Sequence, residues 1–214
     1  MNNNEIVIVG SSGCAKELVF LLKSSKADDG KPWIIKGFVD NENSGSVCNY
    51  PIVGNDDWLF NYKRELNVVI GIGDPKIKKR LAEKLQQNPF LKFPNIVSST
   101  ARIGDNVTLG KGCIICDMNI LTVDIALGNF VTLNLNNTIG HDATIGSYVT
   151  INSGSHISGN VHVGEAVTIG AGTTVIQGLT IGDESIVGAG SVVIRDVNSR
   201  NTVVGNPVRV VKTW

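Results

Sequence analysis

Aliphatic residues recur at every sixth position through the second half of the chain. This spacing matches neither a helix, whose faces repeat every three to four residues, nor a strand, whose faces alternate. It fits a coil with flat sides about six residues long, each of which sends one aliphatic side chain into a shared interior. The pattern therefore predicts a β-solenoid. The aliphatic positions are Val97, Ile103, Leu109, Ile115, Leu121, Leu127, Leu133, Ile139, Ile145, Ile151, Ile157, Val163, Ile169, Val175, Ile181, Val187 and Val193.

Two further periodicities describe the coil. Glycine often follows the aliphatic residue, as at Gly140 and Gly146, because a β-carbon would obstruct the corner there. With three sides the coil repeats after about 18 residues, so residues that far apart should stack in columns. One inward column is small or polar along its whole length: Asn119, Asn137, Ser155, Thr173 and Ser191.

The first part of the chain has a different pattern, in which short β-branched runs alternate with helical patterns. The run Glu5–Val9 ends at Gly10, as a buried parallel strand would, and leucines share one helical face in the segment that follows. Alternating strands and helices predict a small Rossmann-like α/β domain. We expect strands at residues 5–9, 33–39 and 67–72, and helices at residues 14–23, 56–62 and 77–87.

These patterns divide the chain into three parts. We assign residues 1–92 to the α/β domain and residues 93–198 to the solenoid. Residues 199–214 break the hexad register, and we expect this tail to cap the open end of the solenoid.

The composition argues against several kinds of partner. The formal net charge is zero, and no basic patch for nucleic acid or an anionic membrane is present. The apolar runs are far shorter than a membrane span, and the N-terminal segment lacks the basic and apolar regions of a signal peptide. We therefore expect a soluble cytoplasmic protein.

Cys113 and Cys116 have the spacing of a metal or redox pair. The hexad register places Cys113 at an inward position and Cys116 beside a corner, so their side chains should point apart. No second cysteine or histidine pair completes a zinc set. We expect free thiols and no metal.

The hexads resemble those of the bacterial hexapeptide-repeat acyltransferases. Residues 10–13, 71–73, 139–142 and 159–161 resemble one subfamily, the sugar O- and N-acetyltransferases, which includes bacillosamine-pathway UDP-amino-sugar N-acetyltransferases and sialic acid O-acetyltransferases. The resemblance implies a left-handed parallel β-helix, a homotrimer, and acetyl-coenzyme A in the groove between neighbouring prisms. It also implies that the N-terminal domain binds the nucleotide of the acceptor sugar.

Of the three histidines in the sequence, His141 is the candidate for the chemistry. Acyl transfer needs a base that takes the proton of the attacking group, and a neutral imidazole suits this role. Asp142 can orient the ring of His141 and stabilise the imidazolium. The resemblance implies that His141 is the general base. His156 and His162 lie on other columns, and we interpret them as surface residues.

For the acyl donor, the resemblance implies contacts with Thr150, Gly159, Ala171 and Ala189. Thr150 stands where amino-sugar members of the family have a second histidine. Ala171 and Ala189 share a column, and their small side chains would let a pantetheine arm approach the backbone. The alternative is that these positions are small only because the coils pack closely.

For the acceptor, the turn Gly10–Gly13 precedes a helix whose free N–H groups can bind phosphate. Asp40 ends the second strand, where an acid can bind a ribose hydroxyl or a base edge. The resemblance places Ser12, Gly13, Cys14, Asp40 and Gly73 around the nucleotide, with Cys14 where the family often has histidine. Asp74 and Lys78 are further candidates for the phosphate side. The alternative is a helix-capping turn without a ligand.

Together these features predict an acetyl-CoA-dependent acetyltransferase. We expect it to act on the amino group of a nucleotide-activated amino sugar, by direct transfer, in surface glycan or polysaccharide synthesis. One alternative is O-acetylation of sialic acid or another sugar. A second alternative is a non-catalytic solenoid that serves as a binding or scaffold protein.

Overall fold

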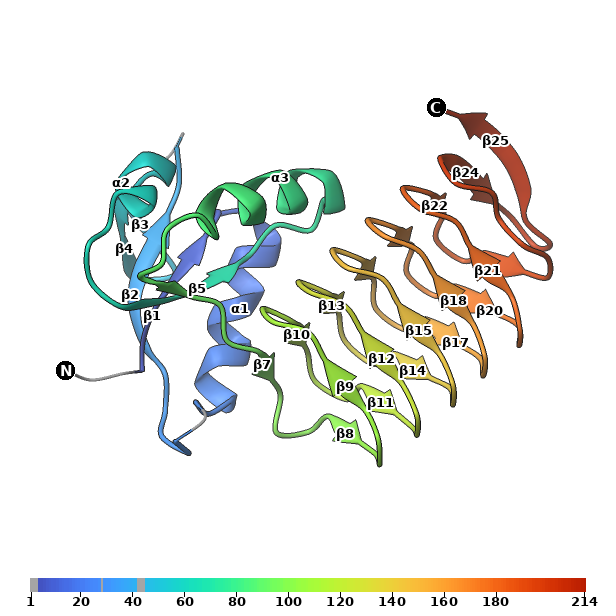
Figure 1. Ribbon diagram of the computed structural model, residues 1–214, viewed down its shortest axis with the longest axis horizontal. Coiled ribbons are helices and arrows are strands. Elements are labelled where there is room, and N and C mark those ends of the chain that lie inside the picture. The colour runs from blue at the N-terminus through green and yellow to red at the C-terminus, as the bar shows by residue number, and fades with distance from the viewer. Residues whose placement is uncertain (1–3, 28, 42–44) are drawn as a thin grey trace.

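The computed structural model describes residues 4–27, 29–41 and 45–214. An N-terminal α/β domain is followed by a three-sided parallel β-helix, and the chain climbs from the domain to the C-terminus at the far end of the helix (Figure 1).

A six-stranded sheet forms the centre of the N-terminal domain, with the order β3-β4-β2-β1-β5-β6. β1 pairs in parallel with both β2 and β5, as the alternating sequence pattern predicts, whereas β3 and β4 pair antiparallel. β3, β4 and β6 were not predicted from the sequence, because they lack a continuous apolar run. The strands are β1 Glu5–Val9, β2 Ile34–Val39, β3 Ser46–Val47, β4 Tyr50–Gly54, β5 Leu66–Ile70 and β6 Leu91–Lys92.

Three helices accompany this sheet: α1 Gly13–Ser24, α2 Asp56–Phe60 and α3 Pro75–Leu85. The start of α3 is defined locally, because Asp74 accepts hydrogen bonds from the backbone N–H groups of Lys76 and Ile77 and Pro75 occupies the first turn.

The solenoid has three faces, here called face 1, face 2 and face 3 in the order in which the chain meets them. Face 1 contains β7 Ile96–Val97, β10 Ile114–Ile115, β13 Thr132–Leu133, β16 Thr150–Ile151, β19 Thr168–Ile169, β22 Ile186–Val187, β24 Asn201–Val204 and β25 Arg209–Thr213. Face 2 contains β8 Arg102–Ile103, β11 Ile120–Leu121, β14 Thr138–Ile139, β17 His156–Ile157, β20 Thr174–Val175 and β23 Val192–Val193. Face 3 contains β9 Thr108–Leu109, β12 Ala126–Leu127, β15 Thr144–Ile145, β18 His162–Val163 and β21 Thr180–Ile181.

The register of the solenoid agrees with the hexad pattern. Strands of one face pair residues that are 18 apart, as in Leu133 with Ile151. The aliphatic residues from Ile115 to Val193 are buried in one core, and the inward polar column is fully buried beside them. The first coil differs, since Ile103 is 39% exposed. No coil lies beneath Ile103 to cover it.

The corners are named by the faces they join: corner 1–2, corner 2–3 and corner 3–1. The fourth residue of each hexad has a left-handed backbone at every sixth position from Asn106 to Gly190, whether or not it is glycine. The glycines at the second position of the hexads are explained by close packing between coils, not by a left-handed backbone. A β-carbon at Gly140 would overlap the backbone of Ser158 and Gly159 in the next coil.

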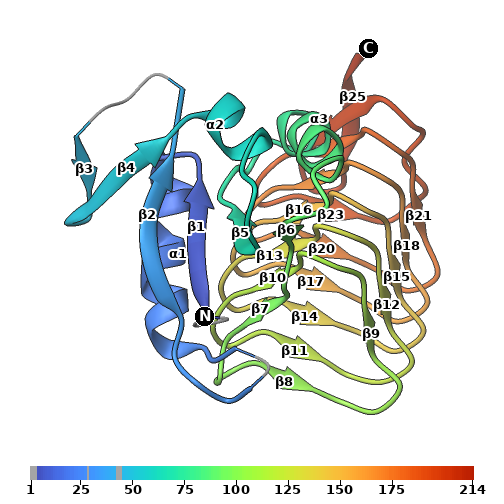
Figure 2. The same ribbon diagram turned by 60° about the vertical axis from the view of Figure 1, so that its left-hand side comes forward.

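Face 1 is covered by the N-terminal domain (Figure 2). Ile96 and Ile114 share a buried cluster with residues of α1 such as Leu18. At corner 3–1, Phe130 and Tyr148 stack with ring centres 5.7 Å apart and join the cluster of α3. The two parts therefore have a continuous interface.

The tail adds β24 to face 1 and then turns back as β25, which pairs antiparallel with β24. Val203 and Val208 join the solenoid core and cover its last coil. Among the described residues, no helix is both long enough and apolar enough to cross a membrane.

Candidate active site

His141 and Asp142 lie together at corner 2–3, directly after β14. The Nδ1 atom of His141 is 2.7 Å from Oδ2 of Asp142. Because an ionised carboxylate only accepts hydrogen bonds, Nδ1 carries the proton of the neutral ring and Nε2 keeps its lone pair. The His141 side chain is 53% exposed, so this lone pair is accessible. The pair has the arrangement that a general base requires.

The imidazole of His141 lies over Gly159, which occupies the same column one coil later. A β-carbon on Gly159 would overlap the ring. Gly159 therefore leaves space for the ring of His141. This role is independent of the predicted contact between Gly159 and an acyl donor.

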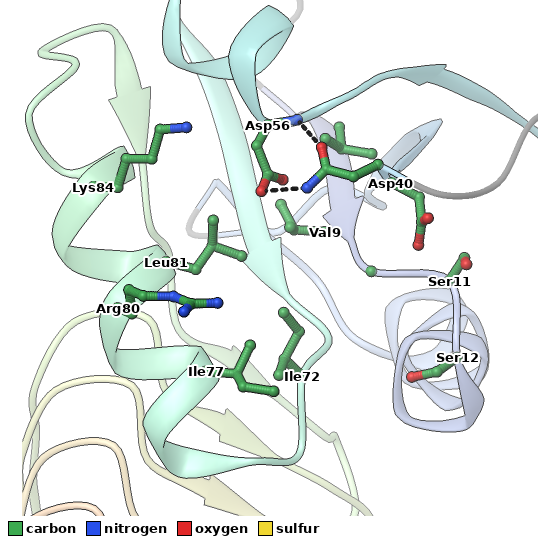
Figure 3. Close-up of a pocket in the computed structure, with 13 residues that line it drawn as sticks. Val9, Ser11, Ser12, Asp40, Asp56, Ile72, Ile77, Arg80, Leu81 and Lys84 are labelled. Atoms are coloured by element: carbon green, nitrogen blue, oxygen red, sulfur yellow. Dashed lines mark hydrogen bonds between the residues drawn. The ribbon is translucent and has the colours of Figure 1, made fainter.

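A pocket of about 580 Å³ opens between the turn after β1 and helix α3, and we call it the α3 pocket (Figure 3). Three of the predicted acceptor residues, Gly10, Ser12 and Asp40, line it. Gly10 has a φ of +90°, a conformation that favours glycine. The turn leads into α1, and the Ser12 side chain makes no capping hydrogen bond to that helix.

The opposite wall of the α3 pocket carries two cations, Arg80 and Lys84, which the sequence analysis did not single out. Lys84 is 3.0 Å from Asp57, whereas Arg80 makes no ion pair within the part of the chain that the structure describes. The signal was available in the sequence, because Ile77, Arg80 and Lys84 share one face of a helix.

Asp74 and Lys78, which were expected to face phosphates, do not line the α3 pocket. Asp74 accepts hydrogen bonds of 2.9 Å from the backbone N–H groups of Lys76 and Ile77 and thereby caps α3. Lys78 points toward the solenoid and is only 1% exposed. The reason is that α3 lies between the α3 pocket and face 1, and Lys78 is on the side of the helix that meets face 1.

A second pocket, of about 560 Å³, lies where the N-terminal domain meets corner 1–2, and we call it the junction pocket. The structure brings together here two groups of residues that the sequence analysis assigned to different ligands. Gly13, Cys14 and Gly73 were predicted for the acceptor, and Thr150, Ala171 and Ala189 for the acyl donor.

Several polar residues of the junction pocket were not predicted, among them Glu17 and Thr132. Asn134, Asn152 and Ser153 line it beside Thr150. Asn134 and Asn152 share a column, and the amide of Asn134 donates a hydrogen bond of 3.0 Å to that of Asn152. Burial raises the pKa of the Cys14 thiol on the opposite wall, and nearby Lys78 opposes this effect.

The two pockets share two turns of the chain. After β1, residues 10–12 line the α3 pocket and residues 13–14 line the junction pocket. After β5, Ile72 lines the former and Gly73 the latter. The N-terminus of α1 therefore stands between them.

His141 is not part of either pocket. It follows β14 at corner 2–3, whereas the junction pocket lies at corner 1–2, beside the N-terminal domain. Within a single chain, the predicted base is therefore separated from all of the predicted binding residues except Gly159.

The other candidate residues lie outside these sites. His156 and His162 are exposed and hydrogen-bonded to Thr138 and Thr144, respectively. The two cysteines of the predicted pair point apart, with Cys113 inside the solenoid core and Cys116 against the cluster of α1.

Two family models match the chain. Residues 5–85 match the PglD N-terminal domain, and residues 160–195 match the bacterial transferase hexapeptide (six repeats). WeeI from Acinetobacter baumannii AYE is 30% identical, covers 96% of this chain and 99% of its own, and superposes with a TM-score of 0.85. The chain belongs to the hexapeptide-repeat sugar acetyltransferase family, and it is an acyltransferase whose solenoid is a left-handed parallel β-helix.

Two other solved structures are similar over the whole chain. One is the acetyltransferase domain of PglB from Neisseria gonorrhoeae FA1090 in complex with acetyl coenzyme A, which is 26% identical, covers 98% of this chain and 100% of its own, and has a TM-score of 0.89. The other is PerB from Caulobacter crescentus in complex with CoA and GDP-perosamine, which is 28% identical, covers 97% of each chain and has a TM-score of 0.87. No curated protein matches the sequence.

Proposed function

We propose that this protein transfers the acetyl group of acetyl-CoA to the amino group of a nucleotide-activated amino sugar. The observation that carries the proposal is the pair of pockets that meet at the N-terminus of α1. Such a pair suits a long ligand with a central anion, because backbone N–H groups at a helix N-terminus favour phosphate. The supporting neighbours include PerB, bound to GDP-perosamine and CoA.

In this arrangement the nucleoside occupies the α3 pocket, and Asp40 accepts hydrogen bonds from its ribose or base. The diphosphate lies at the N-terminus of α1, within reach of Arg80 on the opposite wall. The planar guanidinium of Arg80 can bind two phosphate oxygens at once. The sugar then extends past Gly13 and Gly73 into the junction pocket.

Acetyl-CoA is the acyl donor. We place its pantetheine arm along Ala171 and Ala189, since both line the junction pocket and neither has a side chain beyond a β-carbon. The thioester then reaches the sugar at the domain junction.

The active site needs a second copy of the chain, because His141 and the junction pocket lie at different corners of one solenoid. We infer a homotrimer in which corner 2–3 of one subunit meets the junction pocket of its neighbour. A closed threefold ring gives every subunit the same contact and therefore forms three equivalent sites.

The reaction is a direct transfer. The amine of the sugar attacks the thioester carbonyl, Nε2 of His141 takes a proton from the nitrogen, and the C–S bond breaks to release CoA. Asp142 stabilises the imidazolium that forms. The product is an acetamido sugar, which fits a role in surface glycan synthesis.

An assay of thiol release with acetyl-CoA tests the proposal. Nucleotide-linked amino sugars and matched sugars with a hydroxyl at the same carbon are compared as acceptors. We expect turnover with an amino sugar, and we expect His141→Ala to reduce it by roughly 10²- to 10⁴-fold through loss of the base. Turnover with hydroxyl acceptors alone would establish O-acetylation instead, and undiminished activity of His141→Ala would remove His141 from the mechanism.

A further inference from the structure

The junction between the two parts of the protein contains a buried cation that the proposed reaction does not use. The Nζ atom of Lys78 donates hydrogen bonds to Thr132 Oγ1 at 3.0 Å, Val149 O at 3.2 Å and Thr150 Oγ1 at 2.9 Å. An ammonium has three protons, so these bonds use all of them. No carboxylate forms an ion pair with Lys78 among the described residues.

The two threonines bound to Lys78 differ in one respect. Thr150 donates its only hydroxyl proton to the carbonyl oxygen of Gly73, at 2.8 Å. Thr132 has no such acceptor within the described ranges, and its hydroxyl proton is therefore unused. Both threonines are 2% exposed and line the junction pocket.

Because of this difference, only one of the two hydroxyls can donate a hydrogen bond to a ligand. Thr150 has only an acceptor lone pair left, so it cannot donate a hydrogen bond to the acyl donor without releasing Gly73. Thr132 accepts from a cation and still has a proton to give. A hydrogen bond from the ammonium polarises the hydroxyl and strengthens it as a donor.

We propose that Thr132, polarised by Lys78, donates a hydrogen bond to an oxygen atom of the substrate in the junction pocket, and that Lys78 acts as its positioning residue. The proposal rests on the function proposed above. The oxygen belongs either to the thioester carbonyl of the donor or to a hydroxyl of the acceptor sugar, and both have the lone pair that this donor needs.

The charge of Lys78 depends on pH near neutrality. Burial lowers the pKa of Lys78 to about 7, against the opposing influence of Cys14 on α1, Cys113 in the solenoid core and Asp74 at the start of α3. Burial also raises the pKa of both thiols, that of Cys113 to about 11, so they stay neutral at neutral pH. The polarisation of Thr132 should therefore weaken as the pH rises above about 7.

The first experiment compares Thr132→Val, Thr132→Ser and Thr168→Val in steady-state kinetics with both substrates. Thr168 is the matched control, because it follows Thr150 in the same column of face 1 but does not line the pocket. We expect Thr132→Val to lower kcat/KM by about 10- to 100-fold, the range for a hydrogen bond assisted by charge. Thr132→Ser should recover most of this loss, and Thr168→Val should match the wild type.

The kinetic constants distinguish the two oxygen sources. A raised KM for the acceptor sugar assigns the contact to a sugar oxygen, whereas a lower kcat or a raised KM for acetyl-CoA assigns it to the thioester. An unchanged kcat/KM for Thr132→Val would overturn the inference, as would an equal loss in Thr132→Ser. Absence of wild-type turnover with every acceptor would contradict the proposed function and the inference together.

The second experiment uses Lys78→Met, which keeps an unbranched side chain one atom shorter and removes the charge. The wild-type kcat/KM should fall on the alkaline side of about pH 7, and this fall should be absent in both Lys78→Met and Thr132→Val. Circular dichroism and melting curves establish that each variant is folded. A folded Lys78→Met that keeps the wild-type pH profile would overturn the role of Lys78.

Discussion

The backbone conformation of Asp142 positions its carboxylate beside the ring of His141. Its φ is 58°, in the left-handed region that aspartate tolerates better than most residues. Every neighbouring hexad has the same conformation at this position, so the corner itself imposes it. The carboxylate thereby reaches the ring of the preceding residue, His141.

Gly159→Ala tests how closely the base depends on its neighbours. The new β-carbon would overlap the imidazole of His141 and force the ring away from its position. We expect kcat to fall by at least about 10-fold, because misplacement of a catalytic group by about 1 Å is costly. The φ of Gly159 is not left-handed, so the melting temperature should change little.

A double-mutant cycle provides the control for Gly159→Ala. In the background of His141→Ala the same substitution should have no further effect on turnover, since the group it displaces is gone. An equal effect in both backgrounds would mean that Gly159 acts independently of His141.

Lys78→Met also has a consequence for stability. The pKa of Lys78 is lower in the folded protein than in the unfolded chain, so the unfolded chain binds more protons between about pH 7 and pH 10. The wild type therefore gains stability from this residue as the pH rises through that range. The variant lacks this gain. The difference in the free energy of unfolding between the wild type and Lys78→Met should therefore change by up to about 4 kcal/mol, in favour of the wild type, between pH 7 and pH 10.

Urea unfolding of both proteins at a series of pH values measures this difference. Lys63→Met serves as the control, because Lys63 is exposed. A constant difference between Lys78→Met and the wild type across the range would show that Lys78 keeps its charge.

The sequence was sufficient to pair His141 with Asp142, because the two residues are adjacent and the hexad register fixes their corner. It was not sufficient for Lys78. Helical spacing places Lys78 and Arg80 on different sides of α3. Only the packing of α3 against face 1 decides which of the two lines the α3 pocket. Thr132 was not predicted, because the proposed polarisation of its hydroxyl depends on Lys78, which lies 54 positions away.

At the scale of elements, the solenoid strands from β7 to β23 are only two residues long and gain their stability from stacking. Strands inside the stack are covered by the strand above and the strand below, as in β16 between β13 and β19. The sequence predicted this arrangement because it repeats. In the N-terminal domain β4 was missed, since all of its residues are at least partly exposed and no apolar run marks it.

Ile151→Ala and Ile103→Ala test the contribution of stacking. Ile151 is 0% exposed in the middle of the solenoid, and its truncation should cost about 2–5 kcal/mol of the free energy of unfolding. Ile103 occupies the same hexad position on face 2 of the first coil but is 39% exposed, so its truncation should cost less than half as much. Chemical denaturation measures both, and equal losses would contradict the idea that each coil depends on its neighbours.

At the scale of the whole molecule, the separation of His141 from the junction pocket predicts complementation between subunits. His141→Ala lacks the base, and the double variant Arg80→Ala/Lys84→Ala lacks the cations of the α3 pocket. Each should be nearly inactive alone. In a mixed trimer of either composition, one of the three sites combines an intact His141 from one subunit with an intact pocket from the next.

Co-expression of the two variants with different affinity tags, followed by tandem purification, gives the mixed trimers. Activity well above that of either variant alone is the expected result, with light scattering to establish the trimer. Mixed trimers as inactive as the parents would place base and pockets within one subunit. The pattern of a single chain does not supply this proposed contact, because it would join residues of two molecules.

The uninterrupted repeat also restricts how the protein can change in length. Each coil lengthens the solenoid by one strand spacing, about 4.8 Å. Removing a complete coil keeps every remaining side chain facing the same direction, whereas removing one residue more or fewer turns all later positions away from their faces. A donor site along the solenoid, as proposed for Ala171 and Ala189, could therefore adapt to longer or shorter thioesters only in whole increments, and homologues with different donors should differ by multiples of the coil.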